Sequence, residues 1–146
     1  MKKRVYLDNC CFNRPFDDQS DFRIKMETEA KLEIQQKIQD NDLELVWSYM
    51  LDFENAENPF NDRKEAISRW RQHAVTDIQE TQALIVVARQ IATAGVKNKD
   101  AIHVACALSG ACRYFITTDD AILSRLRDNR EIKVLSPVQF ILGEML

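Results

Sequence analysis

Residues 100–120 read DAIHVACALSGACRYFITTDD, and this stretch decides the fold class. Small and apolar residues recur at helical spacing from Asp100 to Leu108, and Gly110 follows where a helix would end. Residues 114–117 then form a short run rich in aromatic and β-branched side chains, which predicts a buried strand. A helix that leads into a short apolar strand is typical of the βαβ units of a parallel sheet.

The same alternation of strands and helices extends over the rest of the chain. Apolar runs predict further strands at residues 5–7, 43–47 and 132–135. Helical periodicity predicts further helices at residues 20–40, 49–57, 61–73, 77–94, 120–127 and from 137 onward. Residues 9–19, which contain Pro15 and several Asn and Asp, are expected to form a loop. We therefore predict an α/β fold, with three α/β/α layers around a central parallel sheet of four or five strands.

Several helix ends carry capping signals. Ser20 is expected to cap the helix that follows the loop, and Ser48 is expected to cap the helix after the second strand. Residues 76–79, Thr-Asp-Ile-Gln, match a capping box that would open the helix over residues 77–94. Gly95 follows that helix at a position where glycine favours a C-terminal cap.

Composition favours one globular domain over residues 1–146. Of the 146 residues, 45% are hydrophobic and 29% are charged, and only three Gly and three Pro leave little room for linkers. No apolar stretch approaches the roughly 20 residues of a membrane span, and the basic N-terminus reaches Asp8 before a signal-peptide core is formed. We therefore expect a cytoplasmic protein with no membrane partner. Its four cysteines form no CxxC or disulfide pattern and are expected to be reduced and mostly buried.

The net charge of −3 argues against a protein that binds nucleic acid through bulk electrostatics alone. This argument weakens if several carboxylates are neutralised by bound cations, because the remaining charge would then be slightly positive. The distribution of the charges therefore matters more than their sum, and a nucleic-acid substrate is not excluded.

Polar residues, most of them acidic, follow the predicted strands. Asp8 follows the first strand, and Ser48 follows the second, with Glu54 on the next helix. Residues 117–120, Thr-Thr-Asp-Asp, follow the third strand, and Asp100 starts the helix that leads into it. Because the carboxyl ends of parallel strands meet at one edge of a sheet, three or four carboxylates are expected to converge there.

Such a cluster of like charges needs either solvent or a cation to be stable. Carboxylate oxygens with few imidazole or thiolate neighbours favour Mg²⁺ or Mn²⁺ over zinc. These ions polarise phosphoryl oxygens and generate hydroxide from bound water. The chemistry that suits the predicted cluster is therefore phosphodiester hydrolysis.

With these residues in view, the chain resembles the PIN-domain family of ribonucleases, which includes the VapC-type toxins. The resemblance spans almost the whole chain and is carried by VYLD at 5–8, WS at 47–48 with Glu54, KDAIHVACA at 99–107 and FITTDD at 115–120. It implies a sheet with helices on both faces and one or two Mg²⁺ or Mn²⁺ ions. It also implies endoribonuclease activity by metal-activated water, which leaves a 5′-phosphate and a 3′-hydroxyl.

The resemblance also implies roles for individual residues. The metal-binding aspartates are matched by Asp8, Asp100 and Asp119, the second acid of the family by Glu54, and supporting positions by Ser48, Thr117 and Asp120. Many small bacterial members are toxins of toxin–antitoxin pairs. The resemblance therefore implies RNA as the substrate, a homodimer, and an antitoxin as the protein partner.

The residues alone leave some of these assignments open. Asp100 fits the N-cap of its helix as well as it fits a metal ligand. Either Asp119 or Asp120 can be the ligand while the other caps the following helix, and we prefer Asp119 as the ligand.

The second acid also has competitors. Asp52 points to the opposite helix face, whereas Glu57 shares the face of Glu54, and the spacing of the family pattern favours Glu54. His103 lies on the same face as the predicted aspartate of its helix. We expect it to be a packed or supporting residue and leave it out of the catalytic set.

Substrate contacts are predicted from the loop and helix that follow Asp8. Arg14 and Arg23 flank the proposed site and are the candidates for contact with substrate phosphates. Phe12 and Phe16 are expected to pack against the core more than to stack on a base. The rival functions are a nuclease that acts on DNA through the same metal site and a catalytically silent domain that binds RNA or a protein.

Overall fold

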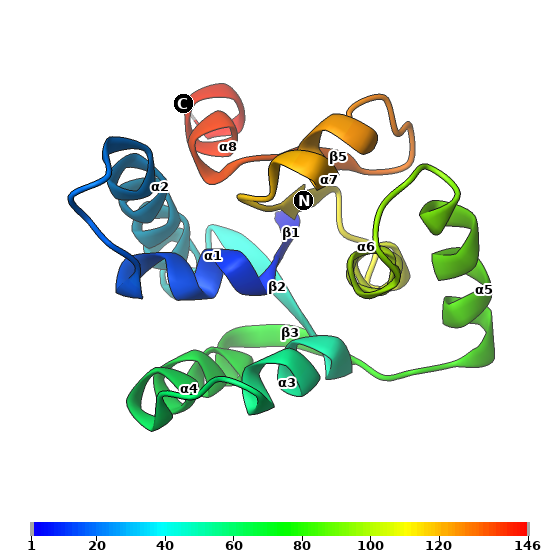
Figure 1. Ribbon diagram of the computed structural model, residues 1–146, viewed down its shortest axis with the longest axis horizontal. Coiled ribbons are helices and arrows are strands. Elements are labelled where there is room, and N and C mark those ends of the chain that lie inside the picture. The colour runs from blue at the N-terminus through cyan, green and yellow to red at the C-terminus, as the bar shows by residue number, and fades with distance from the viewer. Residues whose placement is uncertain (1, 146) are drawn as a thin grey trace.

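The computed structural model describes residues 2–145 and has a single five-stranded sheet in the order β3-β2-β1-β4-β5 (Figure 1). Every neighbouring pair of strands is parallel. The strands are β1 (Lys3–Leu7), β2 (Leu43–Ser48), β3 (Ala74–Ile78), β4 (Tyr114–Ile116) and β5 (Lys133–Leu135). The predicted α/β class and the parallel sheet are confirmed.

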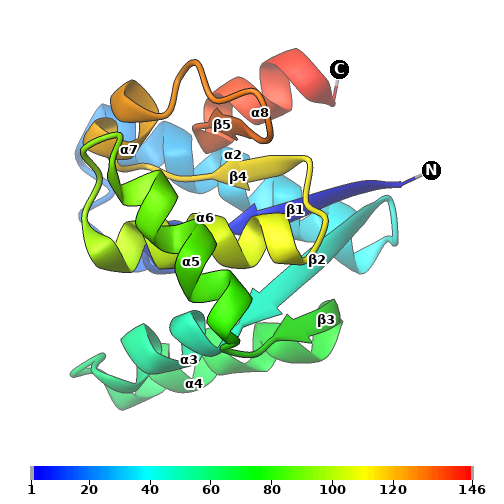
Figure 2. The same cartoon turned by 90° about the vertical axis from the view of Figure 1, so that its right-hand side faces the viewer.

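Helices cover both faces of the sheet. They are α1 (Asn9–Asn13), α2 (Phe22–Gln39), α3 (Tyr49–Ala56), α4 (Asn61–Ser68), α5 (Gln82–Ala92), α6 (Asn98–Ser109), α7 (Asp120–Arg125) and α8 (Pro137–Glu144). Short 3₁₀ segments, η1 (Arg14–Phe16) and η2 (Arg69–His73), follow α1 and α4. Helices α2 and α8 lie on one face and α5 and α6 on the other, as both views agree (Figures 1 and 2). The result is the predicted three-layer α/β/α arrangement. Within the described residues, no helix is both long and apolar enough to cross a membrane.

The central strands are buried on both faces, which is why they were recognisable as continuous apolar runs. Tyr6, Trp47 and Phe115 have no exposed surface, and Phe12 from α1 packs edge-on against Trp47 with ring centroids 5.3 Å apart. The expectation that Phe12 packs in the core is confirmed. The four cysteines are free, and three of them are buried.

The prediction of a helix over residues 77–94 was wrong in its first part. Residues 74–78 form the edge strand β3, in which Thr76 lies beside Val46 and Asp77 beside Trp47. The cap of α5 is Thr81, whose hydroxyl accepts a hydrogen bond from the Leu84 amide at 3.1 Å. Pairing with β2 therefore overrides the local capping box, because an edge strand gains its stability from its neighbour and not from its own sequence.

The prediction of a loop over residues 9–19 was wrong for residues 9–16, which form α1 and η1. Asp8 caps the short helix α1 by accepting a hydrogen bond from the Asn9 amide at 2.8 Å, and α1 buries Cys11. Helix α2 is capped by Asp21 in place of Ser20, because the Asp21 carboxylate accepts from the Ile24 amide at 3.0 Å. The predicted helix over residues 61–73 changes to 3₁₀ geometry after Ser68.

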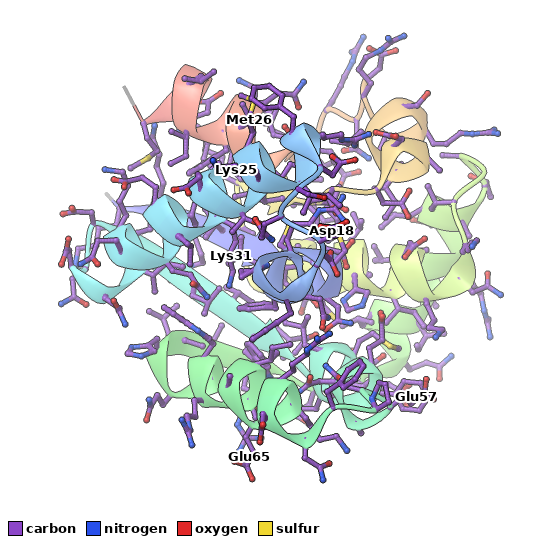
Figure 3. The ribbon with its side chains drawn as sticks, turned by 60° about the vertical axis from the view of Figure 1, so that its left-hand side comes forward. Asp18, Lys25, Met26, Lys31, Glu57 and Glu65 are labelled. Carbon is purple, nitrogen blue, oxygen red and sulfur yellow. The ribbon has the colours of Figure 1, made fainter. Side chains whose placement is uncertain are left out.

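Lys31 on α2 is a charged group inside the fold, lying between α2 and α1 (Figure 3). Only 4% of its surface is exposed, and its ammonium group lies 5.3 Å from the centroid of the Phe12 ring, with no ion pair among the described residues. Burial lowers the pKa of Lys31 from 10.5 to about 8. Below about pH 8 the ammonium is charged in both the folded and the unfolded protein, so the folded state carries the whole cost of burying the charge.

We therefore expect Lys31→Met to raise the free energy of unfolding near pH 7 by about 1–3 kcal/mol. The gain should shrink between about pH 8 and pH 10.5, where the buried lysine of the native protein loses its proton. Urea denaturation at both ends of this range measures the effect. Lys25→Met on the exposed face of the same helix is the matched control. A lower stability of Lys31→Met near pH 7 would contradict the assignment of an unfavourable buried charge.

Candidate active site

The site lies where β1, β2 and β4 end, next to one another at the carboxyl edge of the sheet. Asp8 follows β1, Ser48 ends β2, and Thr117 follows β4. The three side chains are buried, with exposed fractions of 5%, 0% and 0%. The Asp8 amide donates to the carbonyl of Ile116 at 2.9 Å, so the ends of β1 and β4 are fixed to each other.

Thr117 connects Asp8 to Asp119. Its hydroxyl donates to Oδ2 of Asp8 at 2.8 Å and accepts from the amide of Asp119 at 3.1 Å. The thiol of Cys10 lies 3.5 Å from the same Asp8 oxygen and 3.4 Å from the Thr117 hydroxyl. Thr117, predicted from sequence as a supporting residue, therefore positions both the Asp8 carboxylate and the backbone before α7.

A second chain of contacts runs from Glu54 to Ser48 through the interior. His103, which has no exposed surface, contacts the Glu54 carboxylate through Nε2 and Tyr6 through Nδ1, the latter at 2.6 Å. The Tyr6 hydroxyl lies 2.6 Å from the hydroxyl of Ser48, which in turn accepts from the Leu51 amide at 3.2 Å and so caps α3. The predicted supporting residue Ser48 is therefore linked to the second acid by Tyr6 and His103.

The surroundings of His103 raise its pKa above the usual value. Burial lowers its pKa, but the hydrogen bond to Glu54 and the charges of Asp8 and Asp100 outweigh burial and raise the pKa of His103 overall. The reverse holds for Glu54, whose pKa is raised by burial but lowered overall by His103. When it is protonated, the imidazole donates from both nitrogens, to Glu54 and to the Tyr6 oxygen, which leaves the Tyr6 hydroxyl hydrogen for Ser48. Nε2 of the buried His103 contacts the partly exposed Glu54 and also lies 4.0 Å from Asp8.

The position and the pKa of Asp100 indicate that it lies near the other acids. It is the third residue of α6, which is capped by Lys97, so the alternative that Asp100 is the N-cap does not hold. Its pKa is raised from 3.8 to about 6, first by burial and then by the negative charges of Asp8, Asp119 and Glu54, against the opposing charge of His103. Since such effects act over short distances, the four predicted acids share one neighbourhood although they come from four separate segments.

The two adjacent acids at the start of α7 have different environments. Asp119 caps α7 by accepting through Oδ1 from the amides of Ala121 and Ile122, at 2.9 and 3.2 Å. Asp120 is exposed and forms an ion pair with Arg23, 2.7 Å away, whose guanidinium lowers the pKa of Asp120. Asp119 is thus the acid that adds charge to the cluster, and Asp120 faces α2.

The alternatives to Glu54 lie elsewhere. Asp52 accepts a hydrogen bond from the Trp47 indole at 2.9 Å and lies 3.5 Å from Arg71. Glu57 is exposed at the end of α3. Glu54 is the acid of α3 that contacts His103.

Arg14 and Arg23 are both engaged within the protein. Arg14 pairs with Asp17 at 3.1 Å and with Glu27 at 2.9 Å, and Arg23 pairs with Glu27 at 3.4 Å as well as with Asp120. Glu27 is only 3% exposed, so its charge needs these partners. The two arginines neutralise carboxylates where α2 meets η1, and a substrate phosphate would have to compete for them.

The donors of the cluster suit a hard cation, because they are carboxylate oxygens and the single imidazole is already hydrogen-bonded on both sides. Between residues 2 and 145, however, no three His, Cys, Asp or Glu side chains converge closely enough to hold an ion as they stand. Oxygens of Asp8, Glu54 and Asp119 accept instead from Thr117, His103 and the α7 amides. The charges of the other acids add to burial in raising the pKa of Asp100.

No protein-family model matches the chain, and no curated protein matches it either. Sequence analysis missed Tyr6 and underestimated His103. The spacing of His103 from Asp100 was a visible signal, whereas nothing in the sequence separates Tyr6 from an ordinary core residue.

Proposed function

We propose that this protein is a PIN-like, metal-dependent endoribonuclease that hydrolyses phosphodiester bonds in RNA. The feature that supports it most is the position of Asp8, Glu54, Asp100 and Asp119 at the carboxyl edge of a parallel sheet, where burial first, and then the charges of the other three acids, raise the pKa of Asp100. The order of the acids along the chain supports it further, because it is the order of the PIN-domain pattern.

Within this proposal, Asp8, Asp100 and Asp119 would hold one or two Mg²⁺ or Mn²⁺ ions. When bound, such an ion polarises a phosphoryl oxygen and lowers the pKa of a coordinated water. Thr117 keeps Asp8 oriented, and the buried His103 contacts Glu54 and holds its carboxylate beside the cluster. The pKa of Asp100 is raised to about 6, so most of this carboxyl is ionised at neutral pH.

The test is cleavage of a fluorescent single-stranded RNA in the presence of Mg²⁺ or Mn²⁺. We expect cleavage that EDTA abolishes and that leaves 5′-phosphate ends, with a matched DNA strand left intact. Cleavage of the DNA in preference to the RNA would favour the rival nuclease. If neither strand is cut with either metal, the proposed activity is wrong.

A catalytically silent binding domain is the second candidate. Two observations favour it: the acidic oxygens are already hydrogen-bonded within the protein, and Arg14 and Arg23 are paired with carboxylates. A silent domain has no need to gather four carboxylates that repel one another. That unfavourable arrangement makes the nuclease the stronger proposal.

The proposed function includes two protein partners, a second copy of the chain and an antitoxin. The resemblance implies a cytoplasmic toxin that forms a homodimer and is blocked by an antitoxin. An apolar groove of about 470 Å³ between α2 and α8 supports a protein partner, since Phe22 and Leu142 at its edge are 76% and 62% exposed. Figure 3 shows Met26 of α2 next to α8 at this groove.

A further inference from the structure

A second groove, of about 290 Å³, opens directly beside the acids and has a different character. Its wall includes Glu54 and three asparagines, Asn9, Asn13 and Asn58. Phe60 and Arg63, at the start of α4, line it as well. We call this the asparagine groove. Figure 3 shows Glu57, which also lines it, at the end of α3 where the chain turns toward α4.

An exposed aromatic ring and a cation lie next to each other in the lining of the groove. The Arg63 guanidinium lies 4.0 Å from the centroid of the Phe60 ring and 5.4 Å from that of Phe16. Phe60 is 53% exposed and Phe16 is 38% exposed, so the prediction that Phe16 packs into the core does not hold. Unlike Arg14 and Arg23, Arg63 forms no ion pair within residues 2–145. A flat apolar ring beside an arginine plane is the kind of surface on which nucleobases stack.

The wall of the groove is rich in hydrogen-bond acceptors. The side-chain oxygen of Asn9 is buried and has no hydrogen-bond partner among the described residues. The amide of Asn58 donates to Asn13, which fixes the wall, while the carboxylates of Glu57 and Asp17 line the groove as well. These carboxylates would repel a phosphate, but they can accept from the N–H groups of a neutral base.

We propose that the asparagine groove binds one base of the RNA strand next to the phosphate that is cut. This inference rests on the proposed nuclease function and specifies its substrate as single-stranded RNA with an unstacked base. The base stacks at Phe60 and Arg63 and directs its edge to the acceptors of the wall. Guanine fits best, because its ring N–H and amino group are adjacent donors that a carboxylate can accept together.

The experiment measures the binding of short fluorescent RNAs by anisotropy in Asp8→Asn protein, in which the strand is not consumed. The RNAs carry guanine, uracil or an abasic site at one position. Phe60→Ala and Arg63→Gln should each weaken binding of the guanine strand about tenfold. The abasic strand should bind Asp8→Asn protein that keeps Phe60 and Arg63 about as weakly as the guanine strand binds these variants. Phe53→Ala is the matched control, since Phe53 on α3 is equally exposed at 53% but does not line the groove.

The outcomes separate this inference from the nuclease proposal. If the wild type cuts RNA but Phe60→Ala and Arg63→Gln change neither affinity nor KM, the base site is wrong and the nuclease stands. If the wild type cuts nothing but the guanine strand binds in a Phe60-dependent way, the base site stands and the nuclease fails. Equal binding of guanine and abasic strands would also overturn the base site. Both changed side chains lie at the surface of the groove, so the variants should fold like the wild type. Thermal unfolding of the variants checks this.

Discussion

Asp8→Asn should reduce RNA cleavage by at least about 10²- to 10³-fold, a loss of the size seen when one preorganised electrostatic group is removed from an active site. Asp8 is the central acid of the site: it follows the middle strand of the sheet, and its two oxygens accept from the Asn9 amide and the Thr117 hydroxyl. Asparagine keeps the size of the side chain and one of these acceptors, and it removes a negative charge from a repulsive cluster. The fold should therefore be as stable as before, or more stable.

Cleavage rates and urea denaturation of the same samples measure both parts of this expectation. Asp128→Asn is the matched control, because it makes the same charge change at an exposed position that forms no hydrogen bond or ion pair within the described residues. Full metal-dependent activity in Asp8→Asn would contradict the assignment. A collapse of the fold would instead assign Asp8 a purely structural role as the cap of α1.

Asp100→Asn should raise stability and lower activity together. The folded-state pKa of Asp100, about 6, lies above its ordinary value of 3.8, so the folded protein binds more protons between about pH 4 and pH 6. Stability is therefore lost as the pH rises through this window, and the cost is fully present at neutral pH. Because Asp100 is only partly buried, solvent screening reduces the cost, and we expect a gain of about 1–2 kcal/mol for the variant near pH 7.

The pH dependence distinguishes this cause from a general improvement in packing. The gain should disappear below about pH 4, where the wild-type carboxyl is protonated in both states. Urea denaturation near pH 4 and near pH 7 is the measurement. An equal gain at both pH values would mean that charge repulsion is not the cause, and a loss of stability near pH 7 would mean that the acids do not repel one another.

The strands that carry the site were predictable from sequence because of how parallel sheets are buried. Central strands such as β1 and β4 are covered on both faces, so their sequences are short, continuous apolar runs. The polar residue after such a run stands out, which is how Asp8 and Thr117 were found. The edge strand β3 is half exposed and its sequence has no such apolar run. It forms a strand because it pairs with β2, and this pairing is not visible in its own sequence.

The contacts inside the site were not predictable, because they join residues far apart in the chain. Tyr6 and His103 are 97 positions apart, and His103 and Glu54 are 49 apart. The ion pairs of Arg14 and Arg23 with Glu27 likewise depend on how α2 packs beside η1. The acids are identified by their order in the sequence, but the raised pKa of His103 and its link to Ser48 come only from the folded arrangement.

Binding of Mn²⁺ tests most directly whether the four carboxylates act as one site. Isothermal titration near pH 7.5 should show one or two ions bound by the wild type and by Asp128→Asn, and binding should be at least about tenfold weaker in Asp8→Asn and Asp100→Asn, which each remove one carboxylate ligand. Wild-type protein that binds no Mn²⁺ at millimolar concentration, or variants that bind it as tightly as the wild type, would contradict a shared cation site formed by these acids.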